Sequence, residues 1–435
     1  MKKSLFIGIL CMVALLSAGC LQPNNPVHQP ENKHEIPNIT KLNKNGQPVF
    51  NYLYIEANNV DPRVAMGYVL DDGKQTPFFD MVVLFAANIR TRDCRAEQPT
   101  KEHSCTKSGL HLHFNGNVRH ILANRGKYIK PLQDRGIKVV LGLLEDHDGV
   151  AFGTLGSWPM EDVARATNNP LWKDGYPYNE VARKKFLQEV ADTVEYYGLD
   201  GVDFDDEWGS KNPANQIYNS VWPSGDYPYY SSNPAGVNAA WNASGRNIAL
   251  CAAELREMLG PEKIITVYDY KAGGYLPAQV TYNDETKIVR NLVNFSGESM
   301  YGTWVADYKG GVDVIPRSQY APIAIDLGGD RDDANQRARP LPYGGLPTMM
   351  ANHLNGNYGA TLFYNLLNRG RYDGTFTKQT NGDRATDRTR FFNDSSSIEP
   401  QKKMPETYLS LISRTLFGTD VIYIGEDYPQ DWIKF

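Results

Sequence analysis

Three acidic side chains alternate with apolar ones within one short stretch of the sequence. Asp203, Asp205 and Glu207 are separated by single residues, and Val202 and Phe204 precede the first two acids. Successive side chains of a β-strand point to opposite faces, so a strand here would place the three acids on one face, about 6–7 Å apart at a rise of roughly 3.3 Å per residue. Because neighbouring carboxylates repel, we expect at least one proton to stay on the set.

A carboxyl group that keeps its proton near neutral pH can act as a general acid, and this is the chemistry that the pattern favours. Two other interpretations stay open. Carboxylates at this spacing could bind Mg²⁺ or Ca²⁺, since hard cations prefer oxygen ligands, or they could form a solvated acidic end of a strand. The apolar residues between the acids argue against the solvated end, because they indicate that one face of the strand is buried.

The elements that would position these acids recur along the chain. Apolar runs alternate with amphipathic helices, and several runs are near-continuous in Val, Ile and Leu, as expected for strands buried on both faces of a parallel sheet. The runs are Val49–Glu56, Phe79–Ile89, Ile137–Leu144, Leu199–Asp205, Ile264–Tyr270, Leu292–Phe295, Ala321–Leu327 and Ala360–Leu366. The predicted helices, three of which run into a glycine C-cap signal at Gly136, Gly198 or Gly418, are Asn117–Arg135, Asn179–Tyr197, Asn247–Leu259 and Met404–Leu416.

Eight strand–helix units of this kind predict an α/β fold, a (β/α)8 TIM barrel with loop insertions at the C-terminal face of the strands. An open doubly wound sheet is the alternative, but the chain has no GxGxxG after the first run and no Walker loop, which argues against a nucleotide-binding sheet. The acids would lie on the fourth strand and face the barrel interior. Two predicted insertions, Gly209–Arg246 and Arg369–Lys403, follow strands four and eight at the end where barrel enzymes build their sites.

The N-terminus has the features of an export signal. Lys2 and Lys3 precede an apolar run and small residues that lead to Cys20, a pattern that resembles a bacterial lipobox. We therefore expect a lipoprotein signal peptide over residues 1–19 and lipidation of Cys20. The protein would then be an exported bacterial lipoprotein of the outer membrane that contacts the membrane only through this anchor. An ordinary secretory signal is the alternative.

The remaining chain is expected to form one catalytic domain. Residues 20–47, which are rich in Pro, Asn and Lys, predict a flexible tether. The barrel should cover residues 48–424, followed by a C-terminal tail over 425–435. We find no second core and no internal repeat in the sequence.

Charge and cysteine spacing exclude several function classes. The 435-residue chain has 45 Lys and Arg against 50 Asp and Glu, a formal net charge of −5, which argues against a nucleic-acid partner because such proteins normally present a basic surface. The chain has no CxxC pair and no HExxH motif, so a structural or catalytic zinc site has no support in the sequence. We expect no cofactor and no metal. Cys94 and Cys105 share one polar loop of an exported protein and could form a disulfide. Cys251 lies in an apolar helix and is expected to be buried.

The wider pattern around the acids resembles a known enzyme family. The sequence DxxDxDxE, formed by Asp200, Asp203, Asp205 and Glu207, resembles the signature of glycoside hydrolase family 18. Segments over most of residues 49–424 resemble its endo-β-N-acetylglucosaminidase branch, of the Endo H and Endo F type. They are Phe79-Asp80, Phe85-Ala86-Ala87-Asn88-Ile89, Leu112-His113-Phe114-Asn115, Ile129-Lys130-Pro131-Leu132-Gln133, Tyr301-Gly302-Thr303-Trp304 and Tyr364-Asn365-Leu366.

The resemblance implies substrate-assisted hydrolysis, which departs from the two-carboxylate scheme of most retaining glycosidases. The carbonyl oxygen of the substrate's own 2-acetamido group is then the nucleophile, and it forms an oxazolinium intermediate. The resemblance implies that Glu207 protonates the leaving GlcNAc and later activates water. It also implies that Asp205 holds the acetamido N–H, that Asp203 shares a proton with Asp205, and that Tyr301 bonds the acetamido oxygen. Asp200 departs from the alternation and is expected to shape the start of the strand.

Further polar and aromatic residues lie near the ends of other strands. The substrate-binding candidates, for which ordinary barrel packing is the alternative, are Asn88, Tyr268, Trp304, Asp326, Tyr364 and Asn365. Aromatic rings in the first insertion could stack on sugar faces or pack the loop against itself. His147, within Glu145–Asp148, could be taken for part of a metal cluster, but the matching loop of the family contacts substrate.

The resemblance implies an endo-acting hydrolase that cuts the β-1,4 bond between the two core GlcNAc residues of N-glycans, of high-mannose or hybrid type. Chitinases of the same family are one alternative, but many carry an insertion after strand seven and a Trp at the end of strand eight, where this chain has Tyr364-Asn365-Leu366. A surface lipoprotein that binds glycans without cleaving them is another, but it would usually have lost Glu207 or Asp205. The expected partner is an N-linked glycan or glycoprotein, bound by a monomer.

Overall fold

The computed structural model describes the following residues of the chain: 41–58, 60–92, 108–145, 152, 180–205, 234–269, 276–298, 315–322, 324–327, 346–364, 366 and 405–426. All of them lie in one compact unit, residues 34–435. Several predictions fall outside the described residues: the signal peptide over 1–19, lipidation of Cys20, the Cys94–Cys105 disulfide, the insertion Arg369–Lys403 and the tail beyond residue 426.

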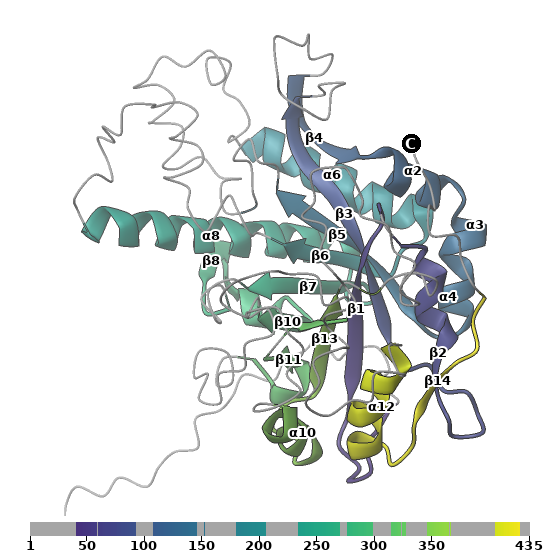
Figure 1. The fold of residues 1–435 in the computed structure, drawn as a ribbon. Helices are drawn as coiled ribbons and strands as arrows, with labels where there is room; N and C mark the ends of the chain where they lie inside the picture. Colours follow the sequence, from purple (N-terminus) through teal and green to yellow (C-terminus); the bar gives the residue numbers. More distant parts are fainter. Residues whose placement is uncertain are drawn as a thin grey trace, which may run out of the picture. The chain divides into compact units, whose positions relative to one another are not determined.

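Parallel strands form a nearly closed barrel with helices around it (Figure 1). Its strands are β1 (Phe50–Glu56), β3 (Met81–Arg92), β5 (Lys138–Glu145), β6 (Gly201–Asp205), β7 (Ile264–Asp269), β10 (Phe295–Glu298), β11 (Tyr320–Ala321), β12 (Ala324–Asp326) and β13 (Ala360–Tyr364). Hydrogen-bonded neighbours follow the order β11-β10-β7-β6-β5-β3-β1-β13-β12. The predicted α/β, (β/α)8 fold is confirmed.

The two ends of this sheet are neighbours in sequence. Only Pro322 and Ile323 separate β11 from β12, so these strands are two pieces of the seventh barrel strand. A proline has no N–H to give to a strand ladder, which accounts for a break in the strand at Pro322. The barrel therefore consists of eight strand positions, each of which overlaps one of the predicted apolar runs.

The sixth run is the one whose position was predicted least well. The prediction placed a strand at Leu292–Phe295, whereas β10 begins at Phe295. Leu292 and Val293 are buried, but they follow the short 3-10 helix η3 (Val289–Asn291) and turn the chain into the strand. An apolar run marks burial, and burial does not distinguish a strand from a packed turn.

The helices match the predictions at their C-termini better than at their N-termini. α6 (Glu180–Tyr197), α10 (Leu346–Leu354) and α12 (Pro405–Leu416) lie outside the strands. Gly136, Gly198 and Gly418 all have positive φ angles, of 80°, 66° and 78°, as predicted for C-caps.

Two predicted helices were wrong in extent. The stretch predicted as one helix, Asn117–Arg135, is split into α2 (Gly116–Ala123), α3 (Arg125–Tyr128) and α4 (Lys130–Asp134). Asn124 interrupts it with non-helical φ and ψ angles of −109° and 38°, and Pro131 removes a donor from the last piece. α8 (Pro234–Leu259) begins well before the predicted Asn247, with a proline at its first position, so the predicted insertion Gly209–Arg246 is shorter than expected.

Several short elements had no counterpart in the predictions. β4 (Ser108–Phe114) pairs antiparallel with β3, and β8 (Gln279–Tyr282) pairs with β9 (Glu285–Ile288). β2 (Tyr68–Leu70) pairs with β14 (Val421–Tyr423) from the far end of the chain. The 3-10 helices η1 (Pro62–Gly67) and η4 (Arg317–Gln319) and the helix α10 also had no predicted counterpart. None of the described helices is long and apolar enough to cross a bilayer.

Lys41 and Asn43 are buried, although residues 41–47 were predicted to belong to the tether. The Lys41 ammonium lies 2.8 Å from the Asp80 carboxylate and donates to the Phe78 carbonyl at 2.5 Å. The Asn43 side chain donates to the His353 carbonyl at 2.8 Å. The prediction that the tether runs to residue 47 is therefore wrong, because this segment contacts residues that precede the barrel strands.

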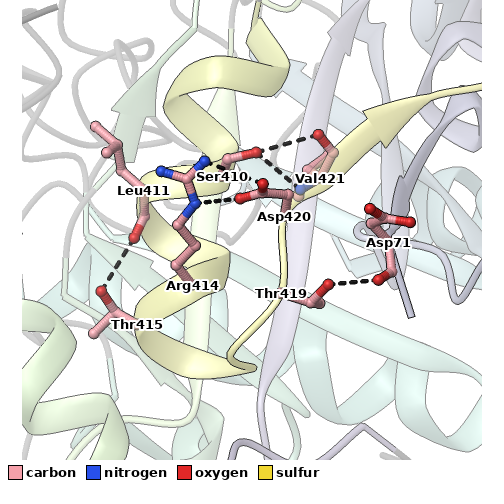
Figure 2. A network of polar contacts seen from close by, with 8 residues as sticks. All are labelled: Asp71, Ser410, Leu411, Arg414, Thr415, Thr419, Asp420 and Val421. Carbon is pink, nitrogen blue, oxygen red and sulfur yellow. Dashed lines mark hydrogen bonds and ion pairs between the residues drawn. The ribbon is translucent and has the colours of Figure 1, made fainter.

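The last described helix, α12, packs against β14 and α10. Figure 2 shows Ser410 of α12 exchanging hydrogen bonds with the Val421 backbone, at 2.8 Å from the N–H and 3.2 Å to the carbonyl. Arg414 of the same helix pairs with Asp420, and Thr419 donates to the Asp71 carbonyl at 2.6 Å. The Ser410 and Arg414 contacts hold β14 on α12, and the Thr419 contact ties the start of β14 to the residue that follows β2.

Candidate active site

The interior of the barrel changes from apolar to polar along the strands. At the N-terminal ends of the strands, the Phe50 and Phe295 rings stack with centroids 4.1 Å apart. The same interior cluster includes Tyr52, Met81, Val83, Val140, Ile264, Ala321, Ala324, Ala360 and Leu362. The acids of β6 lie nearer the C-terminal ends of the strands. Enzymes of this fold place their sites at that end.

Asp203 is held by two hydroxyl groups from two other strands. The Tyr54 hydroxyl of β1 donates to Asp203 Oδ2 at 2.7 Å, and the Thr266 hydroxyl of β7 donates to Asp203 Oδ1. Asp203 is fully buried. Both carboxylate oxygens therefore have a fixed donor, so the side chain has a defined orientation inside the barrel.

Burial raises the pKa of Asp203 to about 6, because desolvation disfavours the charged form, while the Thr266 and Tyr54 hydrogen bonds oppose this shift. The pKa of Tyr54 is raised well above its ordinary value by burial and by the charges of Asp203 and Asp205. Tyr54 therefore remains a proton donor to Asp203 throughout the neutral range.

Asp205 lies one pleat above Asp203 on the same face of β6. Its side chain is buried, and its register neighbour on β7 is Tyr268. The Tyr54 ring lies 5.5 Å from the Tyr268 ring and 6.0 Å from the Phe85 ring. Aromatic rings thus surround the two acids and lower the local dielectric, which strengthens their electrostatic interactions.

The opposite face of β6 packs against the helices, as the alternation predicted. Val202 and Phe204 are buried in the cluster between barrel and helices, and the Phe204 ring stacks on the Phe152 ring at 4.2 Å. The Arg183 side chain of α6 forms a buried, two-point pair with Glu254 of α8, at 2.8 and 2.9 Å. The helices before and after β6 are therefore joined directly behind the strand that carries the acids.

Asp200 has the structural role that its position predicted. Its carboxylate accepts from the Val139 N–H at 2.8 Å and from the Gln133 side chain at 2.9 Å. The Lys138 ammonium lies 3.3 Å away. Asp200 therefore joins the starts of β5 and β6, at the opposite end of the barrel from the other acids.

The described binding candidates come from four different strands and lie at the same end of the barrel. Tyr268 is buried on β7, and Tyr364, the last residue of β13, packs against the interior cluster. Asn88 of β3 is partly buried in register with Leu144. Asp326 is the last residue of β12. Glu207, Tyr301, Trp304 and Asn365 lie outside the described residues.

Comparisons with known proteins give sequence relatives of one kind. No family model matches the chain. Endo-β-N-acetylglucosaminidase F1 of Elizabethkingia meningoseptica is 27% identical over 418 residues, which cover 94% of this chain and 91% of that protein. An endo-β-N-acetylglucosaminidase of a Flavobacterium species is 26% identical over 274 residues, 63% of this chain and 65% of that protein.

The chain is a glycoside hydrolase.

A crystal structure of EndoBT-3987 from Bacteroides thetaiotamicron with a Man5GlcNAc product is also similar to the hydrolase. The two are 20% identical, with a TM-score of 0.49. The similarity covers 88% of the hydrolase and 64% of that chain, so the hydrolase spans just under two thirds of that protein's length.

Two residues of the hydrolase's site, Tyr54 and Thr266, were not predicted from the sequence. The alternation of side chains along each strand could have indicated that both residues point into the barrel. Tyr54 is followed at position i+2 by the partly exposed Glu56 at the end of β1, and Thr266 lies two residues before Tyr268 on the same face of β7. Which inward hydroxyl reaches Asp203 depends on barrel closure, which no local pattern contains.

Within the part of the hydrolase that the structure describes, no group of three His, Cys, Asp or Glu side chains could hold a metal ion. The residues 146–148, which include His147, lie outside that part. Cys251 of α8 is fully buried in the outer cluster, as predicted.

Proposed function

We propose that the hydrolase is an endo-β-N-acetylglucosaminidase of glycoside hydrolase family 18 that cuts the β-1,4 bond between the two core GlcNAc residues of N-glycans. The observation that carries this proposal is the similarity to endo-β-N-acetylglucosaminidase F1 over 94% of the chain. The inward acids at the C-terminal end of β6 support it, because they lie where that chemistry needs them. We expect glycans of high-mannose or hybrid type as substrates.

The proposed reaction is retaining and substrate-assisted. The carbonyl oxygen of the bound sugar's 2-acetamido group attacks its anomeric carbon while Glu207 protonates the leaving GlcNAc. Glu207 then removes a proton from the water that opens the oxazolinium intermediate. Asp205 holds the acetamido N–H, and Tyr301 holds the acetamido oxygen.

The described geometry explains how two buried acids would help this step. At neutral pH Asp203, with a pKa of about 6, is mostly ionised, and its charge is held by the Tyr54 and Thr266 hydroxyls. A fixed negative charge in an aromatic, desolvated interior stabilises positive charge that develops above it. The positive charge in this reaction forms on the oxazolinium ring, next to Asp205.

The cleavage site can be tested by mass spectrometry. A denatured high-mannose glycoprotein treated with the hydrolase should keep one GlcNAc on each modified Asn. If no GlcNAc or both GlcNAc residues remain, the proposed cleavage site is wrong. Chitin oligomers and complex N-glycans, digested in parallel, test the chitinase alternative and the glycan type.

The role of Glu207 and the absence of a metal requirement have separate tests. Glu207→Gln should abolish glycan release but retain glycan binding, since the amide is nearly isosteric with the acid and cannot donate its proton to the leaving group. EDTA should leave the wild-type rate unchanged. A large loss of rate with EDTA would support metal binding by the acids instead.

We also propose that the remaining strand-end residues bind the glycan: Asn88, Tyr268, Trp304, Asp326, Tyr364 and Asn365. The described ones, Asn88, Tyr268, Asp326 and Tyr364, come from four different strands and lie at the same end of the barrel as Asp205. Alanine substitution should raise KM more than it lowers kcat, if these side chains contact sugars that do not react.

Finally, we propose that the hydrolase is an outer-membrane lipoprotein anchored through Cys20 and active as a monomer. The charged N-terminus, apolar run and small residues before Cys20 support this. In cells of an expressing bacterium, wild type should fractionate with membranes and Cys20→Ala should not. Equal fractionation of both would refute lipidation at Cys20, and a dimer mass in solution would refute the monomer.

A further inference from the structure

The inward face of β1 ends in a carboxylate that belongs to none of the acids considered so far. Phe50, Tyr52 and Tyr54 alternate along β1 and all belong to the interior cluster. Ile55 and Ala57, on the other face, belong to the outer cluster. Glu56 therefore shares the inward face of β1 with these three aromatic residues. It is the inward residue of β1 nearest the C-terminal end of the barrel.

Two backbone contacts fix the position of the Glu56 side chain. The Ala57 N–H donates to the Phe85 carbonyl of β3 at 2.9 Å, which holds the chain where it leaves β1. The Asn58 N–H donates to Glu56 Oε1 at 3.2 Å. The turn that follows β1 thus orients the carboxylate, so little rotamer freedom is lost when a ligand binds it.

Glu56 lies where the interior becomes accessible to solvent. Tyr54, one pleat below it, is buried, whereas Glu56 is partly exposed. Its register neighbour on β3 is Phe85, which packs on the interior cluster. The carboxylate therefore lies above the aromatic layer that surrounds Asp203 and Asp205.

The distance to the acids of β6 is short on the scale of a sugar. The Tyr54 side chain alone spans from β1 to the Asp203 carboxylate. Glu56 lies one pleat, about 6–7 Å, beyond Tyr54 on β1, and Asp205 lies one pleat beyond Asp203 on β6, both toward the C-terminal end of the barrel. A pyranose ring seated on Asp205 would therefore have Glu56 on its opposite side.

We propose that Glu56 is a substrate-binding residue whose carboxylate accepts hydrogen bonds from hydroxyl groups of the GlcNAc ring bound over Asp205. Sugar hydroxyls are donors, and hydrogen bonds to an ionised acceptor are about twice as strong as neutral ones. The identity of the ring rests on the proposed function. The position of Glu56 beside the reacting ring assigns it to the core sugar and not to the mannose arms.

The test compares Glu56→Gln and Glu56→Ala with Glu195→Gln, a control in which an exposed glutamate of α6 loses its charge. Binding of a chitobiosyl-asparagine core and of a high-mannose glycan is measured by calorimetry in the non-cleaving Glu207→Gln background. Glu56→Ala should weaken both ligands by about 10- to 100-fold, the range for a lost hydrogen bond to a charged group. Glu56→Gln keeps the shape and should weaken both less than Glu56→Ala, and Glu195→Gln should weaken neither.

The possible outcomes separate the proposal from the function on which it rests. Affinities of the Glu56 variants within twofold of the background protein would overturn it. A loss seen only with the high-mannose glycan would overturn the assignment to the core ring. If wild type fails to release N-glycans, the proposed function is wrong, and titration with chitin oligomers then tests the Glu56 contact on the same GlcNAc ring. Thermal unfolding of Glu56→Gln confirms that a loss of affinity comes from a folded protein.

Discussion

Asp203→Asn should change the pH dependence of stability by an amount that the structure sets. The pKa of Asp203 is raised from 3.8 to about 6 by burial inside the barrel. Since the folded protein binds this proton more tightly than the unfolded chain, the carboxyl stabilises the fold fully below about pH 3.8, and this contribution is lost as the pH rises through about 6. At 1.36 kcal/mol per pKa unit, the loss is about 3 kcal/mol.

Asparagine has the same shape and no charge, so it lacks this pH dependence. We expect the free energy of unfolding of Asp203→Asn, relative to wild type, to rise by about 2–3 kcal/mol between pH 4 and pH 7.5. For a chain of this size that corresponds to about 3 °C in the relative Tm. Urea unfolding at both pH values measures the difference directly. The exposed Asp192→Asn of α6 controls for the loss of one formal charge.

Using the difference between variant and wild type removes the contributions of the other titrating groups. A relative stability that is equal at pH 4 and pH 7.5 would mean that the folded protein does not desolvate the Asp203 carboxyl. A relative stability that falls with pH would mean that the two hydroxyl donors outweigh burial. Either result would refute the account of the site in which burial raises the pKa of Asp203.

Three other substitutions have defined outcomes. Thr266→Val removes one donor from the ionised Asp203 and should raise the pKa of Asp203 further, by about 1–2 units. The acidic limb of the pH–rate profile should then move to higher pH, whereas Thr266→Ser, which keeps the hydroxyl, should leave it in place. An unmoved limb in Thr266→Val would contradict this role. Lys41→Ala removes the cationic partner of the Asp80 carboxylate, which keeps only its hydrogen bond from the Asn51 N–H, and should lower the free energy of unfolding by about 3 kcal/mol, measured in urea. The double variant that adds Asp80→Asn should recover stability; equal losses in both variants would argue against the pair. Gly297→Ala would press a methyl group against the Tyr52 hydroxyl inside the barrel and should lower the free energy of unfolding by about 1–3 kcal/mol. An unchanged urea midpoint would contradict this packing.

The barrel strands could be predicted because their burial is visible in the sequence. A barrel strand is covered by helices on its outer face and by side chains of the other strands on its inner face. Both faces must therefore be apolar, which gives continuous apolar runs such as Ile137–Leu144. The strand with acids on one face was an exception whose period of two could still be recognised. Val202 and Phe204 pack outward for this reason, while Asp203 and Asp205 point inward.

Elements whose partners are distant in sequence could not be predicted. β2 is stabilised by β14 from the other end of the chain, and Lys41 by Asp80 and the Phe78 carbonyl. Neither segment has a local apolar pattern strong enough to indicate packing. The contact between Tyr54 and Asp203 joins residues 149 positions apart, so their separation in space depends on the number and tilt of the intervening strands.

The same packing closes the barrel and tunes the acids. Phe50 and Phe295 fill the interior at the N-terminal ends of the strands, so water does not reach Asp203 from that side. The Tyr54 ring, which carries the hydroxyl that reaches Asp203, packs near Phe85 and Tyr268. A cavity opened in this aromatic layer would admit water next to the carboxylate, and water would weaken both the charge and the orientation that the hydroxyls give it. The catalytic strand therefore depends on packing residues as well as on residues proposed to contact substrate, and substitution of Phe50 or Phe295 should change activity first through the pH dependence of the rate.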